Sequence, residues 1–135
     1  MNALQSKYGD KLVVIGVPCN QFGLQEPAKN HTELMNGIKH VRPGSGFEPN
    51  FKLTAKVDVN GDNEIPLFTY LKKHCPSTRD GFGKKEDLFY HPFKNWDVRW
   101  NFEKFLIDPT GRPYMRYDPA AEPLEHIESD VVNLI

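Results

Sequence analysis

Two short segments of the sequence carry side chains that could do chemistry. The first runs from Pro18 to Pro27, with the sequence PCNQFGLQEP, and the second runs from Trp100 to Leu106, with the sequence WNFEKFL. Gln25, Trp100 and Asn101 within these segments are neutral hydrogen-bond donors. If the three donors met at one point, they would stabilise a thiolate or selenolate without pairing it with a cation. They would also stabilise the alkoxide that leaves when an O–O bond is cleaved.

A purely structural explanation of the three residues is favoured by their spacing alone. Trp100 could anchor a hydrophobic core, Gln25 could be an ordinary loop amide, and Asn101 could cap a helix or sit in a turn. The position of the first segment argues for function, because it directly follows a predicted strand. Ligands of open α/β sheets collect at the carboxyl ends of the strands.

The hydrophobic pattern predicts an α/β domain that would hold the two segments. Leu12–Val17 is a continuous, mostly β-branched run, which predicts a strand buried on both faces, and the alternation over Phe51–Val57 predicts a half-buried strand. The sequence also predicts helices: a helix tail over Asn2–Tyr8 ended by Gly9, a helix over Glu33–His40 capped by Thr32, a helix from Pro66 to about His74, and a last helix from Pro123 with Leu124, Ile127, Val131 and Leu134 on one face. A surface loop is predicted over Pro76–Lys85. Strands at Phe102–Ile107 and Pro113–Tyr117 would form a hairpin, joined by a type I turn at Asp108–Gly111. A terminal hairpin followed by a helix is the back half of a thioredoxin-like fold.

The composition excludes several classes of function. A length of 135 residues fits a single domain over residues 1–135. The net charge of −1 gives no field that would attract nucleic acid, and no apolar run is long enough to span a bilayer. The five histidines lack metal-ligand spacing, and Asp58–Glu64 fits a solvated turn better than a calcium loop. We therefore expect no metal, no nucleic acid and no membrane span.

The strings CNQFGLQEP and WNFEKFL resemble the two signature segments of the glutathione peroxidase family. The string VRPGSGFEPNF, Val41–Phe51, resembles the loop of its tetrameric cytosolic and plasma branch, and the similarity covers nearly the whole chain. The resemblance implies a thioredoxin-like fold and a tetrad of selenocysteine or cysteine with glutamine, tryptophan and asparagine. The last three would be Gln25, Trp100 and Asn101.

The resemblance also implies a reaction and its reagents. A selenolate or thiolate would attack the peroxide, and thiols, usually glutathione, would reduce the resulting selenenic or sulfenic acid in two steps. Arg42 matches a family arginine implicated in glutathione binding. Glutathione would be a co-substrate, so no other cofactor is expected. The loop Pro43–Pro49 would form the contact of a homo-tetramer or dimer.

The nucleophile of such a site would lie ahead of Met1, since the family places it at the start of the helix whose tail is Asn2–Tyr8. We therefore expect an N-terminally truncated domain that lacks the first strands and is inactive by itself. One hypothesis is a UGA selenocysteine codon that was interpreted as a stop. Strand Leu12–Val17 would then have an unpaired edge, and we expect the chain to be poorly stable or to aggregate.

Alternatives to a glutathione-dependent peroxidase stay open. Cys19 is best explained as a small buried hydrophobe. Cys75 does not match the resolving cysteine of the thioredoxin-dependent branch, and this mismatch favours glutathione as the reductant. In contrast, Asp118–Ala121 stands where the cytosolic enzymes carry a pair of arginines, and this replacement argues against glutathione specificity. The alternatives are a thioredoxin-dependent thiol peroxidase and a non-catalytic truncated isoform that binds partners. Cytoplasmic and secreted locations both remain open, because a signal peptide would precede Met1.

Overall fold

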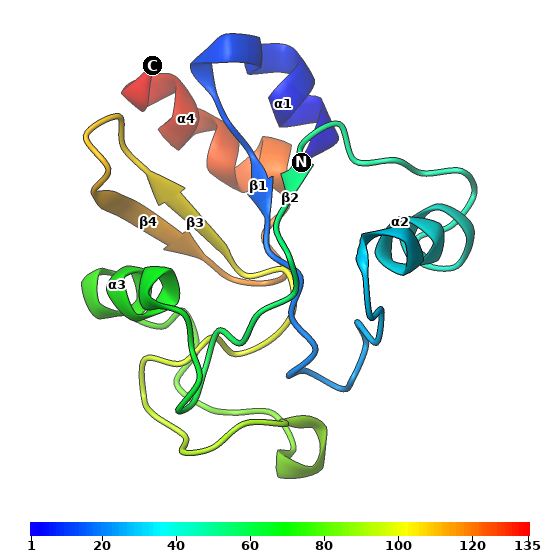
Figure 1. Ribbon diagram of the computed structural model, residues 1–135. Helices are drawn as coiled ribbons and strands as arrows, with labels where there is room; N and C mark the ends of the chain where they lie inside the picture. The colour runs from blue at the N-terminus through cyan, green and yellow to red at the C-terminus, as the bar shows by residue number, and fades with distance from the viewer.

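The strands of the computed structural model, which describes residues 1–135, form two separate two-stranded sheets (Figure 1). β1 (Ile15–Gly16) pairs in parallel with β2 (Lys52–Leu53). β3 (Lys104–Ile107) pairs antiparallel with β4 (Pro113–Tyr117). In Figure 1, β1 lies between β2 and the β3–β4 hairpin, yet no backbone ladder joins β1 to β3. The backbone edge of β1 that faces away from β2 therefore has no strand partner.

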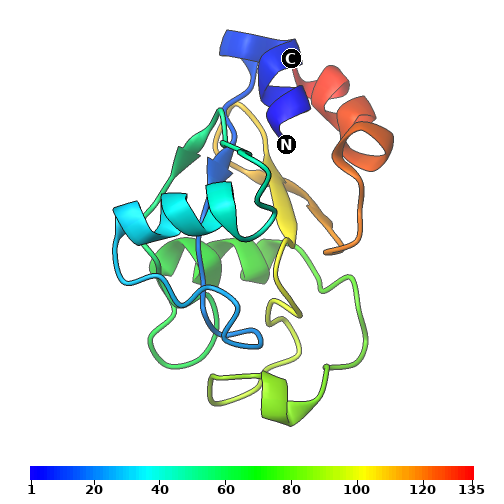
Figure 2. The same cartoon turned by 90° about the vertical axis from the view of Figure 1, so that its right-hand side faces the viewer.

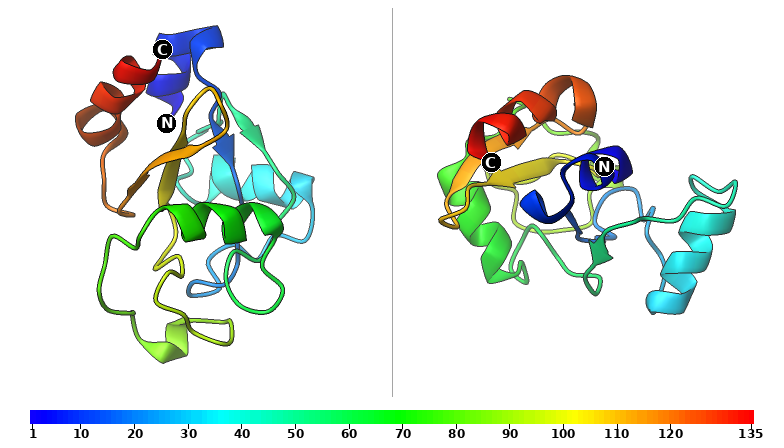
Figure 3. Two further views of the ribbon diagram at one scale, coloured as in Figure 1. Left: turned by 90° about the vertical axis from the view of Figure 1, so that its left-hand side faces the viewer. Right: turned by 90° about the horizontal axis from the view of Figure 1, so that it is seen from above.

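The helices lie on both sides of the β3–β4 hairpin. Seen from above, α1 and α4 lie together on one side of the hairpin, α3 lies on the other, and α2 projects at the periphery (Figure 3). The α-helices are α1 (Asn2–Tyr8), α2 (His31–His40), α3 (Pro66–His74) and α4 (Glu128–Leu134), which follows a π-helical turn at Pro123–Ile127. No helix has the length and the apolar character that a membrane crossing requires.

The two faces of β3 pack into different hydrophobic clusters, as the two-residue period of a strand requires. Leu106 joins a cluster built from α1, β4 and the C-terminal helical segment, with Leu4, Tyr117, Ile127 and Val131. Phe105, on the opposite face, packs edge-on against Phe68 of α3, with ring centroids 5.9 Å apart. The second cluster consists of Cys19, Phe22, Val59, Leu88 and Val98. This second cluster lies next to both signature segments, because Phe22 belongs to the first segment and Val98 lies two residues before the second.

Most of the elements predicted from the sequence are confirmed. α1 ends at Gly9, where φ is +49°, a backbone angle that glycine adopts without strain. α3 and β4 have the predicted bounds, and the turn between β3 and β4 is closed by a bond of 2.9 Å from the Gly111 N–H to the Asp108 carbonyl. Ile127 and Val131 are buried as predicted, whereas Leu124 is 51% exposed.

The prediction that Leu12–Val17 is a strand buried on both faces is wrong. Only two of these residues pair with β2; Val14 is buried, but Val13 is 71% exposed and Ile15 58% exposed. The physical reason is that no second strand and no helix covers this part of β1. The predicted unpaired edge is confirmed, since β1 has a strand partner on one side only.

Two local predictions need smaller corrections. The cap of α2 is Asn30 and not Thr32, because the Asn30 Oδ1 accepts a hydrogen bond of 3.0 Å from the Glu33 N–H. The alternating strand predicted over Phe51–Val57 is shorter than expected: β2 contains Lys52 and Leu53 alone.

Candidate functional site

The structure brings together amides from the two signature segments. The Asn101 Nδ2 donates to the Gln25 Oε1 at 3.0 Å and to the Phe22 carbonyl at 3.3 Å. A carboxamide has two N–H bonds, so both donors of Asn101 are occupied. The Gln25 Nε2 and the Trp100 Nε1 donate to no group of the protein. Gln25 and Trp100 are thus the free donors, and Asn101 fixes the orientation of Gln25.

Trp100 is held against the first segment by packing. Its half-buried ring lies 5.8 Å from the ring of Phe22, measured between centroids. A Cβ atom at Gly23, whose φ is +63°, would lie 3.4 Å from the indole and 3.3 Å from the Gln25 side chain. Glycine at this position therefore allows both the left-handed backbone and the close approach of the two side chains.

The backbone next to the two amides is strained. Leu24, which precedes Gln25, has φ of +50°, and Phe102, which follows Asn101, has φ of +65°. For residues other than glycine, the left-handed conformation costs about 1–2 kcal/mol. Phe102 is also 77% exposed. Strained backbone of this kind clusters at functional sites. The positive φ angles of Leu24 and Phe102 therefore support a functional role for their neighbours Gln25 and Asn101.

A chain of buried amides positions the second segment relative to the first. The Gln21 Oε1 accepts from the Val59 N–H at 3.0 Å and the Asn60 N–H at 3.1 Å, and the Gln21 Nε2 donates to the Asn60 carbonyl at 2.9 Å. The Asn60 side chain in turn donates to the Val98 carbonyl at 2.8 Å and accepts from the Val98 N–H at 2.9 Å. Val98 lies two residues before Trp100. These amides therefore tie the start of one segment to the start of the other.

The interpretation of Asp58–Glu64 as a solvated turn is wrong in its central part. Asn60 is 1% exposed and belongs to the hydrogen-bond network just described. In the sequence, the Asn60-Gly61 pair predicts a turn, and the structure has a turn there, with Gly61 at φ of +81°. The pair predicts a turn equally well at the surface and in the interior, so the buried position could not be inferred from it.

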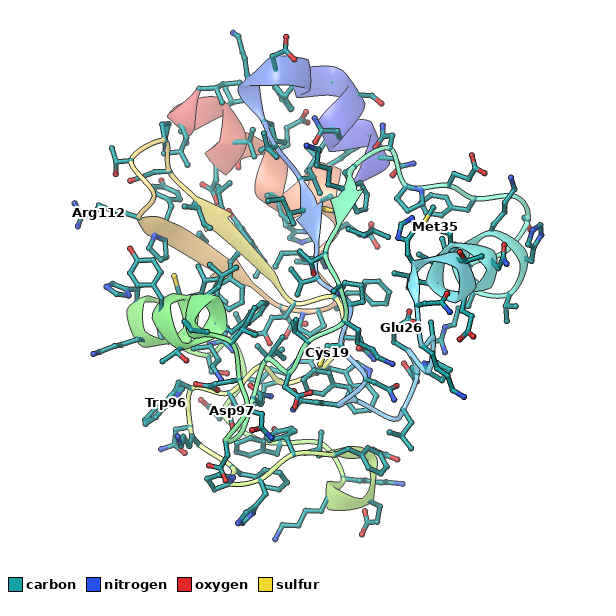
Figure 4. The ribbon with its side chains drawn as sticks, in the orientation of Figure 1. Cys19, Glu26, Met35, Trp96, Asp97 and Arg112 are labelled. Carbon is teal, nitrogen blue, oxygen red and sulfur yellow. The ribbon has the colours of Figure 1, made fainter.

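Lys72 is a buried cation beneath this network. Its ammonium donates to the Val59 carbonyl at 2.8 Å and the Asn60 Oδ1 at 3.1 Å, and it forms ion pairs with Glu64 and with Asp97, the latter at 3.4 Å. Asp97 lies in the interior, in the loop beneath α3 (Figure 4). The sequence signal was available: Lys72 lies four residues after Phe68, on the buried face of α3.

Neither thiol of the chain resembles a reactive nucleophile. Cys19 and Cys75 are 8% and 5% exposed, and burial raises the pKa of both thiols above the ordinary range. The Cys19 Sγ donates to the Gln21 Oε1 at 3.4 Å, and its side chain points into the interior (Figure 4). The interpretation of Cys19 as a small buried hydrophobe is confirmed.

Arg42 is not brought to the amide site by any contact in the structure. It is exposed and follows α2, which Figure 2 shows at the outer side of the molecule. Its side chain forms no ion pair, and only its backbone N–H is engaged, with the Gly37 carbonyl at 2.8 Å. The role of Arg42 in binding glutathione stays a prediction.

Comparisons with known proteins support the family that the sequence resembles. A family model described as "Glutathione peroxidase" matches residues 1–72. The chain is 48% identical to glutathione peroxidase 6 of Mus musculus over 136 residues, which is 100% of this chain and 61% of that protein. It is 50% identical to glutathione peroxidase 3 of Caenorhabditis elegans over 123 residues, 89% of this chain and 54% of that protein.

Two solved structures are also similar. The structure described as T. cruzi GPX1 has a TM-score of 0.66 and 29% identity, over 98% of this chain and 67% of that one. The structure described as Trgpx in apo form has a TM-score of 0.62 and 30% identity, over 98% and 63%. The chain belongs to the glutathione peroxidase family, and its fold is the thioredoxin-like α/β fold. It spans about three-fifths of the length of the curated relatives it matches, 61% for the mouse protein.

Proposed function

We propose that this protein is a glutathione peroxidase, which reduces hydrogen peroxide and organic hydroperoxides with glutathione in the response to oxidative stress. Membership of the family supports the reaction class. The observation that carries the proposal is the contact of 3.0 Å between the Asn101 Nδ2 and the Gln25 Oε1, which unites two segments 76 residues apart. Glutathione would act as co-substrate, and no prosthetic group is required.

The roles of the three site residues follow from their free and occupied donors. The Gln25 Nε2 and the Trp100 Nε1 would donate to the sulfur or selenium anion and then to the oxygen that leaves as the O–O bond breaks. Both donors are neutral, so the anion keeps its nucleophilicity. Asn101 acts as a positioning residue, because its two N–H bonds hold Gln25 and the Phe22 carbonyl. Loss of one such donor at a developing oxyanion lowers kcat by about 10²–10³ in other enzymes.

We further propose that the nucleophile is not among these 135 residues. A nucleophilic thiol needs a low pKa and access to solvent. Cys19 and Cys75 are buried, and burial raises the pKa of each. The 135-residue chain alone would then be inactive, and the selenocysteine or cysteine would be encoded ahead of Met1.

Two measurements test this proposal. In an assay that couples glutathione oxidation to NADPH consumption, the 135-residue chain should show no turnover above buffer with hydrogen peroxide, and turnover lost in Cys19→Ser would contradict the assignment of Cys19. The transcript upstream of Met1 should contain a family-like segment with an in-frame UGA or cysteine codon.

The donor roles need a form of the protein that carries such a segment. In that form Gln25→Ala should reduce kcat at least tenfold, and Asn36→Ala, which removes an exposed amide of α2, should leave kcat unchanged. Equal kcat values in the two variants would refute the role of Gln25. Replacing glutathione by thioredoxin in the same assay distinguishes the thioredoxin-dependent alternative.

The absence of an accessible thiol supports one other candidate function for the 135-residue chain. It would act without catalysis, by binding related peroxidase subunits through the exposed loop Pro43–Pro49, in which Phe47 is 39% exposed. Size-exclusion chromatography of the chain mixed with a peroxidase subunit tests this candidate. Two separate peaks at micromolar concentration would exclude it.

A further inference from the structure

The gap between β1 and β3 is bordered by backbone that has no partner. β1 pairs with β2 alone and β3 pairs with β4 alone, so each strand presents one open edge to the gap (Figure 1). The N–H and C=O groups of Val13 and Val17 form no hydrogen bond. On the opposite edge, the Val14 N–H donates to a side-chain carbonyl of α1 at 2.8 Å, and the Gly16 C=O accepts from the Thr54 N–H at 2.9 Å. Because successive strand residues direct their backbone groups to opposite edges, the unpaired groups face the gap.

Apolar side chains along the gap are exposed. Val13 is 71% exposed, Ile15 is 58% exposed, and Phe102, just ahead of β3, is 77% exposed. Leu12 packs on the cluster of α1 and α4, and Phe105 packs on the second cluster, so hydrophobic clusters lie on both faces of the strands here. An open strand edge is a template for pairing with a further strand. A strand in the gap would be covered on both faces and would need apolar side chains on both.

The charges near the gap favour an uncharged occupant. Leu12–Val17 contains no charged residue. At the start of β3, the Glu103 carboxylate accepts from the Arg116 guanidinium at 2.6 Å, and the Lys104 ammonium donates to two carbonyls of the loop after β4 at 2.8 and 2.9 Å. Both charged groups are therefore engaged within the protein. A charged side chain inserted into the gap would find no free partner and would be costly to bury.

One end of the gap lies at the amide site. β1 and β3 run in opposite directions, and the lower end of the gap in Figure 1 lies between the segment after β1 and the segment before β3. Cys19 and Glu26 mark the first of these segments, below the end of β1 (Figure 4). A strand parallel to β1 would end beside Gln25 and Trp100, because the carboxyl ends of parallel strands meet at one edge of a sheet. The residue after such a strand would reach the free donors of these two side chains.

We propose that the gap is an acceptor site for a strand of a separate polypeptide. The strand is extended, uncharged and apolar, pairs in parallel with β1, and carries a thiol or selenol directly after its carboxyl end. It pairs with the free backbone groups of Val13 and Val17 and covers the Ile15 side chain. Main-chain hydrogen bonds supply affinity in this mode of recognition, and the side chains supply specificity. The purpose of the thiol rests on the proposed function, whereas the binding of the strand does not.

The thiol of the bound strand completes the reaction. Its thiolate attacks one oxygen of hydrogen peroxide, so the O–O bond breaks, an S–O bond forms, sulfur is oxidised to a sulfenic acid, and the other oxygen leaves as water after it takes up protons. A first glutathione converts the sulfenic acid to a mixed disulfide and water. A second glutathione attacks that disulfide, restores the thiol and leaves as glutathione disulfide. Gln25 and Trp100 donate to the thiolate and then to the departing oxygen.

Binding is measured on the 135-residue chain, refolded from urea with each peptide and without peroxide. The probe is acetyl-KKVVIVVGC-amide with a fluorophore on the first lysine; the lysines keep the peptide soluble. The control, acetyl-KKVVPVVGC-amide, keeps the thiol but has a central proline, which lacks an N–H donor and interrupts strand pairing. Fluorescence anisotropy should give a Kd on the order of 10 μM for the probe, and the control should bind at least tenfold more weakly.

Two matched valine variants locate the bound strand. Val13→Asp should weaken binding of the probe at least tenfold, because the new carboxylate would be buried against an apolar strand. Val41→Asp, at a residue that is 79% exposed at the end of α2, should change Kd less than twofold. The acceptor site is overturned if the two variants bind alike, if the two peptides bind alike, or if the chain aggregates equally with and without the probe.

Turnover separates the acceptor site from the proposed function. With hydrogen peroxide and glutathione, the chain together with the probe should oxidise glutathione at least tenfold faster than the probe alone. Serine in place of the cysteine of the peptide should abolish this gain and leave binding unchanged. Binding of the probe without any gain in turnover would uphold the acceptor site and refute the donor roles of Gln25 and Trp100.

Discussion

The buried amide of Asn60 gives the sharpest test of how this structure is held together. The change to make is Asn60→Ala, which removes the hydrogen bonds to the Val98 N–H and the Val98 carbonyl. The variant also removes one acceptor from the Lys72 ammonium. All three groups are buried, and the methyl group of alanine offers none of them a replacement.

The expected loss of stability follows from the groups left without a partner. A buried polar group without its hydrogen bond costs about 1–3 kcal/mol. The two backbone groups of Val98 together therefore lower the free energy of unfolding by about 3 kcal/mol, with a smaller share from Lys72. This is a large fraction of the roughly 5–15 kcal/mol that folded domains possess.

The assay is urea unfolding followed by tryptophan fluorescence, with Asn63→Ala as the matched control. Asn63 lies in the same turn, is exposed, and its side chain forms no hydrogen bond, so its removal should cost less than about 0.5 kcal/mol. Asn60→Ala should unfold at a clearly lower urea concentration, or already be unfolded in buffer. If the two variants had the same midpoint, the amide chain from Gln21 to Val98 would not contribute to stability and the reasoning would be refuted.

Three further predictions follow from buried and charged groups. Lys72→Ala leaves two carboxylates without their cation and should lower the free energy of unfolding by about 3–5 kcal/mol, whereas alanine at the exposed Lys73 should change it by less than 0.5 kcal/mol. Both cysteines, whose pKa values burial raises, should react with iodoacetamide at pH 7 more slowly than in urea; equal rates would contradict their burial. Arg79 holds the pKa of the Asp118 carboxyl well below its ordinary value, so the pair contributes stability above about pH 4 and loses it as the pH falls. Because the pair is partly exposed, the contribution should stay below about 1 kcal/mol, and the difference in urea midpoint between Asp118→Asn and wild type should be largest at pH 6 and shrink as the pH falls from 4 towards 2.

Elements with a local signal could be predicted from the sequence. α3 begins at Pro66, which fits the first turn of a helix, and the β3–β4 hairpin is marked by the Pro109 and Gly111 of its turn. The end of α1 is set by Gly9, whose positive φ suits glycine. In each case one residue restricts the backbone directly, so no knowledge of the tertiary structure is needed.

Features that depend on distant partners could not be predicted. The β-branched run around Ile15 indicates a strand buried on both faces, but burial depends on neighbouring strands and helices, and in this structure β1 has one strand partner. Asn60 has the sequence context of a surface turn, and only the approach of Val98 makes it a buried residue.

The members of the candidate site can be proposed from the sequence, but which of their hydrogen-bond donors are free cannot. The donor chemistry of Gln25, Trp100 and Asn101 can be inferred from residue type. Both N–H bonds of the Asn101 side chain are donated to groups of the protein, and this can be seen only from the three-dimensional structure. The two strained residues beside the amides carry no signal in the sequence, because leucine and phenylalanine rarely adopt positive φ.

The gap between the two small sheets affects how accurately the site can be held. Gln25 follows β1, and Asn101 precedes β3, so the site lies across a seam that no backbone ladder crosses. In a continuous sheet, the spacing between two strands would set the distance between their ends. Here the distance is set by the Asn101–Gln25 contact and by the buried amides of Gln21 and Asn60. A displacement of one sheet relative to the other would therefore change the separation between Gln25 and Trp100 directly, because no strand pairing resists it.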